Sequence, residues 1–266
     1  MRTWIDGFML KVELHSHTAD DPVDNIPHST RELIDRAAAL GFDALAITLH
    51  NRQLDVRPWQ SYAADRNVVL IPGVECTIKG RHVLLLNFDR EAEDVRSFDD
   101  LASLKARSPG LVIAPHPFFP STTCLWNALD RHAALFDAVE RNAMFTRGVD
   151  FNVRAERWAR AHGKPIVGNG DVHRLRQLGT TYTLVDAERH PDAICQAIAA
   201  GRVQVVSEPL DWMTVVAVLS SMIIAGRRRG WRDTLRPNTH AAHLMRQEGL
   251  DGQDRLDGGG RRASAS

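Results

Sequence analysis

Five short apolar segments of this chain each end in residues that commonly bind metal ions. The first segment, Val12-Glu13-Leu14, is followed by His15-Ser16-His17-Thr18. Two histidines one residue apart at the end of a strand point to the same side, so both imidazoles can reach one metal ion or two neighbouring ones. The other four segments end in Thr48-Leu49-His50, Gly73-Val74-Glu75, Pro115-His116-Pro117 and Gly168–His173, the last of which contains Asp171 and His173. This repetition predicts a metallohydrolase in which several strand ends converge on one site.

Strand and helix patterns alternate along the chain. Ser29 and Glu32 form a capping box at the start of a helix that Gly41 ends. Short connections between strands and helices predict parallel βα units, and because the metal-binding residues follow several different strands, a barrel is favoured over an open sheet. We predict further helices at 98–107, 127–136, 151–162 and 191–200, and strands at 42–48, 68–71, 82–88, 111–115, 137–141, 165–168, 181–185 and 203–207.

The candidate ligands combine imidazole and carboxylate groups and include no cysteine. Such a set suits Zn, Mn or Fe better than Ca or a structural thiolate site. Taken singly, Glu75 is also compatible with a capping or solvated residue, His116 with a rigid turn between prolines, and Asp171 with a polar turn. As a set these residues predict a metal centre: His15, His17, Glu75, His116, Asp171 and His173.

The order and spacing of these motifs resemble the PHP (polymerase and histidinol phosphatase) superfamily, from about Val12 to Pro209. The resemblance rests on His-x-His-Thr, Gly-Val-Glu, Ala-Pro-His-Pro and Gly-Asp-Val-His, and on the segments LGFDALAITLHN, RHVLLLNFD and LGTTYTLVDAERHPDAICQAIAAGRV. It implies an α/β fold, a distorted (β/α)7 TIM-like barrel, as in bacterial stand-alone members. It also implies a site that holds two or three divalent metal ions (Zn, Mn or Fe), with one bridging carboxylate.

The resemblance adds ligands and shows two departures. His50 and His82 stand where the family has ligand histidines. The family's second motif usually reads Thr-Asp-His, whereas this chain has Leu49 before His50, so a hydrogen bond to a ligand is expected to be lost. Many members also have a ligand aspartate five residues after the second histidine, where this chain has Pro22. Among the nearby acids Asp20, Asp21 and Asp24, we expect Asp21 to bind metal, with Asp24 as the alternative.

The implied catalytic residues are Glu75, as the bridging carboxylate, and Asp171, as the group that orients the attacking water or accepts its proton. Asn142, Arg147 and Arg174 are the candidates for contacts with substrate. For each arginine the alternative is an ordinary surface residue, and for Asn142 it is a turn.

These features predict a metal-dependent phosphoesterase that hydrolyses a small phosphorylated metabolite or a short nucleotide through a metal-activated water. One alternative is hydrolysis of another bond, such as an amide, on the same barrel, because a fold does not determine a reaction. A second alternative is a non-catalytic metal-binding module, which Leu49 and Pro22 favour. Lys and Arg total 33 and Asp and Glu also total 33, so no net charge attracts a long nucleic acid.

Three regions follow from the composition. Residues 1–210 are expected to form the barrel, residues 211–226 an apolar helix, and residues 227–266 a polar, disordered tail. The apolar stretch is too short to span a bilayer, which takes about 20 residues. Contact of residues 212–229 with a membrane surface is an alternative to a buried or amphipathic helix.

The compartment is expected to be the cytoplasm. The three cysteines are scattered and odd in number, which suits a reducing environment. The first residues, MRTWIDGFMLKVE, carry acidic side chains and lack the long apolar core of a signal peptide.

Overall fold

A computed structural model describes residues 9–216 of the 266. These residues belong to one compact unit. Residues 212–216 are helical, and Asp211 Oδ1 accepts from the backbone N–H of Thr214 at 2.8 Å. The apolar helix expected at 211–226 stays a prediction. The remainder of that helix and the expected tail at 227–266 lie outside the described residues.

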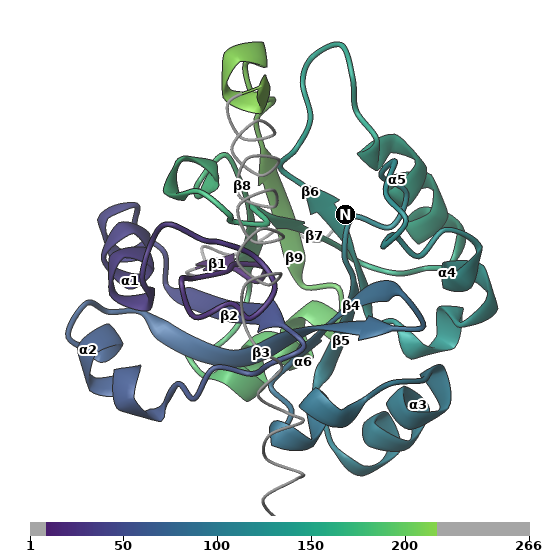
Figure 1. The fold of residues 1–266 in the computed structure, drawn as a ribbon, viewed down its shortest axis with the longest axis horizontal. Helices are drawn as coiled ribbons and strands as arrows, with labels where there is room; N and C mark the ends of the chain where they lie inside the picture. Colours follow the sequence, from purple (N-terminus) through teal and green to yellow (C-terminus); the bar gives the residue numbers. More distant parts are fainter. Residues whose placement is uncertain (1–8, 217–266) are drawn as a thin grey trace, which may run out of the picture. The chain divides into compact units, whose positions relative to one another are not determined.

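The described part of the chain forms a nine-stranded mixed sheet that curls into a nearly closed barrel (Figure 1). Its strand order is β7-β6-β5-β4-β3-β2-β1-β8-β9. The strands are β1 (Leu10–Glu13), β2 (Ala44–His50), β3 (Val69–Ile78), β4 (Arg81–Leu86), β5 (Leu111–Ala114), β6 (Ala138–Asn142), β7 (Ile166–Asn169), β8 (Thr181–Val185) and β9 (Val203–Ser207).

The prediction of parallel βα units is only partly right. The pairs β1–β2, β2–β3, β5–β6 and β6–β7 are parallel. The pairs β3–β4, β4–β5, β1–β8 and β8–β9 are antiparallel. The reason is local: only Lys79 and Gly80, both with positive φ, separate β3 from β4, and two residues allow a hairpin but no crossover helix.

The barrel closes where β7 approaches β8 and β9. The backbone N–H of Gly168 donates to Thr183 Oγ1 at 2.8 Å, and that hydroxyl donates to the carbonyl of Gly168 at 3.0 Å. A Cβ at position 168 would lie 2.7 Å from Val205 Cγ1 and 2.9 Å from the carbonyl oxygen of Tyr182. Only glycine therefore permits this approach.

The outside of the sheet is covered by helices (Figure 1). They are α1 (Thr30–Ala39), α2 (Gln60–Ala64), α3 (Phe98–Arg107), α4 (Asn127–Arg131) and α5 (Asn152–Ala161). Helix α6 (Pro191–Ala199) packs instead against residues of the barrel interior. The capping box at Ser29 is confirmed, because its side chain accepts from the backbone of Glu32 and the Glu32 side chain accepts from the backbone of Ser29. The predicted bounds of α3 are confirmed, whereas α2 was not predicted. No helix within residues 9–216 is long and apolar enough to cross a bilayer.

Three apolar clusters lie on the two sides of the sheet. Alternate strand residues, such as Val12, Ala46 and Ile113, fill the interior and pack against Ile194 and Ile198 of α6. On the outside, one cluster packs strands against α1 and α2, and another packs them against α3, α4 and α5. Helix α6 and the apolar residues packed against it fill one end of the barrel interior. The polar side chains therefore lie at the other end, where β1, β2 and β7 end.

Candidate metal centre

Two histidines follow β1 and face the inside of the barrel. Between them, Ser16 continues the strand pairing, since its hydroxyl donates to the carbonyl of Ala46 at 2.6 Å and its backbone bridges to Val172. Strand alternation then directs His15 and His17 to the same side. Both side chains are fully buried, and their ring centroids are 5.3 Å apart.

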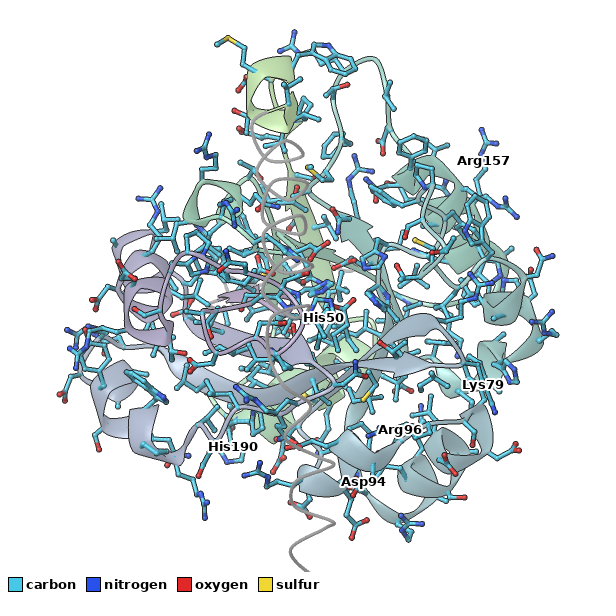
Figure 2. The ribbon with its side chains drawn as sticks, in the orientation of Figure 1. His50, Lys79, Asp94, Arg96, Arg157 and His190 are labelled. Carbon is cyan, nitrogen blue, oxygen red and sulfur yellow. The ribbon has the colours of Figure 1, made fainter. Side chains whose placement is uncertain are left out.

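Glu75 lies among the imidazoles, with each carboxylate oxygen facing its own group of nitrogens. Its Oε2 is 3.3 Å from His15 Nε2, 3.4 Å from His17 Nε2 and 3.2 Å from His50 Nε2. Figure 2 shows His50 near the centre of the molecule. The Oε1 atom of Glu75 lies 2.6 Å from His82 Nδ1 and 3.3 Å from His116 Nε2.

Glu75 reaches this position from within a strand. The strand predicted at 68–71 ends before Glu75, but β3 continues through Pro72 and Gly73 to Ile78. Gly73 is needed there, because a Cβ would come within 2.8 Å of both Leu86 Cδ2 and Thr48 Cγ2. Burial opposes ionisation of Glu75, but the imidazoles of His82, His15 and His50 outweigh it and hold its pKa well below the usual range.

Asp171 and His173 approach the same cluster from the end of β7. Asp171 has a φ of 48°, a left-handed conformation that turns its side chain toward the histidines. Its Oδ1 atom is 3.4 Å from His15 Nε2, 3.7 Å from His17 Nε2 and 3.3 Å from His173 Nδ1. The fold thus brings together the ends of β1, β2 and β7 with β3, β4 and His116, which is two residues past the end of β5.

The donor atoms fit divalent metal ions. The Nε2 atoms of His15 and His17 are buried and have no hydrogen-bond partner among residues 9–216. Leaving such atoms unpaired is costly unless they bind something. Donors that share a zinc-sized ion at about 2.0–2.1 Å lie roughly 3.3 Å from one another in a tetrahedral arrangement, which is close to most of the nitrogen–oxygen separations around Glu75. Triads such as His15–His17–Glu75 and His50–Glu75–His82 have all their ligand atoms within 4.8 Å.

The comparisons with known proteins agree with this geometry. A family model described as PHP-associated matches residues 150–203. A two-domain protein of Bacteroides vulgatus that contains a predicted PHP-like metal-dependent phosphoesterase has a similar structure, with a TM-score of 0.59 and 19% identity over 84% of this chain and 72% of that chain. These findings show a PHP-like fold and support the resemblance to the PHP superfamily that the sequence motifs indicated.

Two other solved structures are also similar to the chain. PsfC of Pseudomonas syringae has a TM-score of 0.57 and 19% identity, over 86% of this chain and 99% of that chain. A lesion-specific endonuclease of Pyrococcus furiosus has a TM-score of 0.52 and 14% identity, over 74% of this chain and 57% of that chain. No curated protein sequence matches the chain.

The sequence did not lead us to predict two buried glutamates, Glu13 and Glu140, that contact the candidate ligands on the side away from Glu75. Glu140 Oε1 lies 2.9 Å from His15 Nδ1, and its Oε2 accepts from the backbone N–H of His116 at 2.6 Å. Glu13 accepts from the backbone N–H of His15 at 3.0 Å and from that of Gly170 at 2.9 Å. Burial raises the pKa of Glu13 to about 8. A single acid inside an apolar strand is the sequence signal that could have revealed both residues.

Asp21 lies on the outer side of two histidines. Its Oδ2 atom is 2.9 Å from His17 Nδ1 and 3.0 Å from His50 Nδ1, while the Nε2 atoms of both rings face Glu75. Asp24, the alternative, has its Oδ2 atom 2.9 Å from His173 Nε2. Asp21 is therefore placed to orient the imidazoles of His17 and His50. Asp24 lies beside His173, where both side chains could bind the same metal ion.

The side chain of Leu49 lies outside the metal centre. Its side chain is fully buried in the cluster under α1 and α2, together with Leu33, Ile34 and Ile47. Strand alternation directs His50 to the opposite side of β2. The hydrogen bond that we expected to be lost beside His50 is provided by Asp21, which accepts from its backbone N–H at 3.0 Å and contacts its Nδ1.

The three candidates for substrate contacts lie in different places. Asn142 ends β6, lines the cavity beside the metal centre, and donates to Asp171 Oδ2 at 3.1 Å. Arg147 is exposed on the segment between β6 and α5. Arg174 donates to the carbonyl of its neighbour His173 at 2.8 Å. Neither arginine is among the cavity-lining residues.

The cavity measures about 310 Å³ and opens above the metal centre. Candidate ligands form part of its lining, namely His50, Glu75, His82, His116, Asp171 and His173. Other lining residues are Phe119, Pro120 and Met144. Among the described lining residues none is Lys or Arg, so bound metal ions would be the main positive charge that a substrate meets.

Proposed function

We propose that this protein is a metal-dependent phosphoesterase that acts on a small phosphorylated metabolite or a short nucleotide. The observation that carries the proposal is the position of Glu75. Each of its two oxygens faces a separate group of imidazole nitrogens, as expected for a carboxylate between two neighbouring metal positions. The similar structure of Bacteroides vulgatus described as PHP-like and phosphoesterase-containing supports the same class of reaction.

The residues divide into two groups around Glu75. His15, His17 and Asp171 would hold one metal ion with Glu75 Oε2, and His82 and His116 would hold another with Oε1. His173 and Asp24, with His50 nearby, offer donors for a third. A mixed imidazole and carboxylate set suits Zn, Mn or Fe. When bound, such ions lower the pKa of water toward neutrality and act as Lewis acids toward a phosphoryl oxygen.

Neighbouring carboxylates determine which ring nitrogen of each ligand histidine carries the proton. Because Glu140 is a hydrogen-bond acceptor at Nδ1 of His15, the Nδ1–H donates to it and the lone pair of Nε2 faces the metal position. The same arrangement at Asp21 directs Nε2 of His17 and His50 toward Glu75. These contacts hold the imidazoles in the tautomer that binds a metal.

Asp171 is the proposed proton acceptor. It contacts the metal-facing nitrogens through Oδ1 and also lines the cavity, so it reaches both the ligands and a bound substrate. Asn142 donates to its Oδ2 atom and keeps the carboxylate oriented. A carboxylate in this position can take a proton from the attacking water while the phosphoester oxygen leaves on the opposite side.

The test combines metal analysis with three substrates. Protein purified without chelator is assayed with p-nitrophenyl phosphate, bis(p-nitrophenyl) phosphate and an acyl amide, each with added Mn or Zn. The proposal expects two or three metal ions per chain and turnover of at least one phosphoester. Turnover of the amide alone would reject phosphoester hydrolysis in favour of the amide alternative. Bound metal without turnover of any substrate would favour the non-catalytic alternative.

A substitution at Glu75 tests whether phosphoester turnover depends on the metal centre. Glu75→Gln is expected to lower turnover by at least about 100-fold, because the amide nitrogen cannot replace a carboxylate oxygen between two metal positions. The control is Glu188→Gln, which changes an exposed glutamate elsewhere on the barrel. Near-normal turnover of Glu75→Gln at saturating metal would remove Glu75 from the role of bridging carboxylate.

A further inference from the structure

Two phenyl rings extend from the candidate ligand His116 toward the surface: Phe119 lines the cavity, and Phe151 packs on Phe119 outside the lining. The ring of Phe119 lies edge-on to His116, with centroids 6.4 Å apart and an interplanar angle of 74°. On its other side Phe119 contacts Phe151, at 5.4 Å and 54°. Phe151 is 40% exposed, although a phenyl group gains free energy from burial. An apolar surface thus begins at a candidate metal ligand and continues into solvent.

Two further apolar residues line the cavity with Phe119, next to the polar Ser121 and Thr123. Pro120 and Met144 line the cavity with Phe119, and we refer to Phe119, Pro120, Met144 and Phe151 as the aromatic wall. The backbone N–H of Phe119 donates to the carbonyl of His116 at 3.3 Å, which fixes the start of the wall relative to the ligand. Met144 adds a side chain that adapts to the shape of a bound ring.

The charges around the cavity indicate what the wall does not bind. Among the described residues that line the cavity there is no Lys or Arg, and Arg147 and Arg174 lie outside the lining. Arg154, whose guanidinium stacks on Phe118 and Trp126, is also outside it. A second phosphate or a carboxylate on the substrate would therefore find no cationic side chain in this lining, whereas an apolar ring would find a matching surface.

We propose that the aromatic wall binds an aromatic ring in the alcohol portion of the substrate, and that the substrate carries a single phosphate. This inference rests on the proposed phosphoesterase function and specifies its substrate class. With the phosphate at the metal centre, the ester oxygen lies at the start of the wall beside His116. The ring then lies edge-on or offset to Phe119 and Phe151, the geometries that aromatic pairs prefer.

The experiment compares two monoesters with a similar leaving oxygen, benzyl phosphate and ethyl phosphate. The wild-type protein is expected to hydrolyse the benzyl ester with kcat/KM at least about 10-fold higher, as an apolar pocket typically discriminates. Phe119→Ala and Phe151→Ala are each expected to raise KM for the benzyl ester and so to lower the ratio of kcat/KM for benzyl phosphate to kcat/KM for ethyl phosphate toward 1. Phe98→Ala, which removes a phenyl ring that stacks on His132 instead, is the control.

A binding measurement separates this inference from the proposed function. Benzylphosphonate and ethylphosphonate are titrated calorimetrically into the metal-loaded protein, since neither is hydrolysed. Tighter binding of benzylphosphonate, lost in Phe151→Ala and retained in Phe119→Tyr, supports ring binding even where neither ester is hydrolysed. Equal affinities for the two phosphonates, or an equal loss for both in Phe151→Ala, would overturn it. Absence of ester hydrolysis would count against the phosphoesterase function alone.

Discussion

His15 Nδ1 lies 2.9 Å from Glu140 Oε1, and both side chains are fully buried. The two residues are 125 positions apart in the chain. Glu140 also accepts from the backbone N–H of His116 and from Asn169 Nδ2. One carboxylate therefore orients ligands on both sides of Glu75.

Replacing this carboxylate should weaken metal binding. In Glu140→Gln the amide nitrogen cannot accept from the backbone N–H of His116, so one of its contacts is lost. Changes in groups that orient metal ligands typically lower metal affinity by about 10–100-fold, and we expect a loss in that range. Metal titration followed by calorimetry measures it, with Glu188→Gln as the control. Unchanged affinity in a folded Glu140→Gln protein would show that the His15 orientation does not depend on this contact.

Asp171→Asn tests the proposed proton acceptor. The amide keeps the shape of the side chain but cannot accept a proton, so turnover is expected to fall by at least about 100-fold. Circular dichroism should show an unchanged fold, because the side chain lies at the edge of the cavity and not in an apolar cluster. The measurement is kcat at saturating metal. A variant that keeps most of its turnover would assign proton transfer to another group.

Leu49→Asp should destabilise the fold. Leu49 is buried among Leu33, Ile34 and Ile47, so the new carboxylate would have no polar partner in that cluster. We expect a loss of at least about 3 kcal/mol in the free energy of unfolding, the usual cost of burying an uncompensated charge. Denaturant titration measures this loss. The control, Leu49→Met, keeps the volume and should cost less than about 1.5 kcal/mol. A stable Leu49→Asp protein with tighter metal binding would instead place position 49 beside the centre.

Removal of metal should lower the melting temperature. A ligand that binds only the folded state at 100 times its Kd adds about 2.7 kcal/mol, which is roughly 5–10 °C in Tm for a domain of this size. Treatment with a chelator should therefore lower Tm, and adding Mn or Zn should restore it. In Glu75→Gln the shift should be smaller, because one side chain links both groups of histidines. An identical Tm with and without metal would contradict a centre built from these side chains.

The helix boundaries depend on residues close together in the chain, and for that reason several could be predicted. Ser29 and Glu32 begin α1 by exchanging hydrogen bonds three residues apart, and α3 has the predicted bounds. The direction of the strands could not be predicted in the same way. The pattern at 68–71 does not show that β3 continues to Ile78, and this continuation leaves only Lys79 and Gly80 as the connection that makes β4 antiparallel to β3.

The amino-acid sequence by itself determined which residues are available to bind metal and on which side of each strand they lie. The one-residue spacing of His15 and His17 gives this result in any extended segment. Asp171, by contrast, faces the histidines through its positive φ of 48°, after β7 has ended. Only the tertiary structure decided which carboxylates form the hydrogen bonds that orient these ligand residues. Glu13, Asp21 and Glu140 are far in sequence from several of their partners, and Leu49 belongs to the core because β2 is covered by α1 and α2. The physical reason is that such contacts arise from barrel closure, which local spacing does not encode.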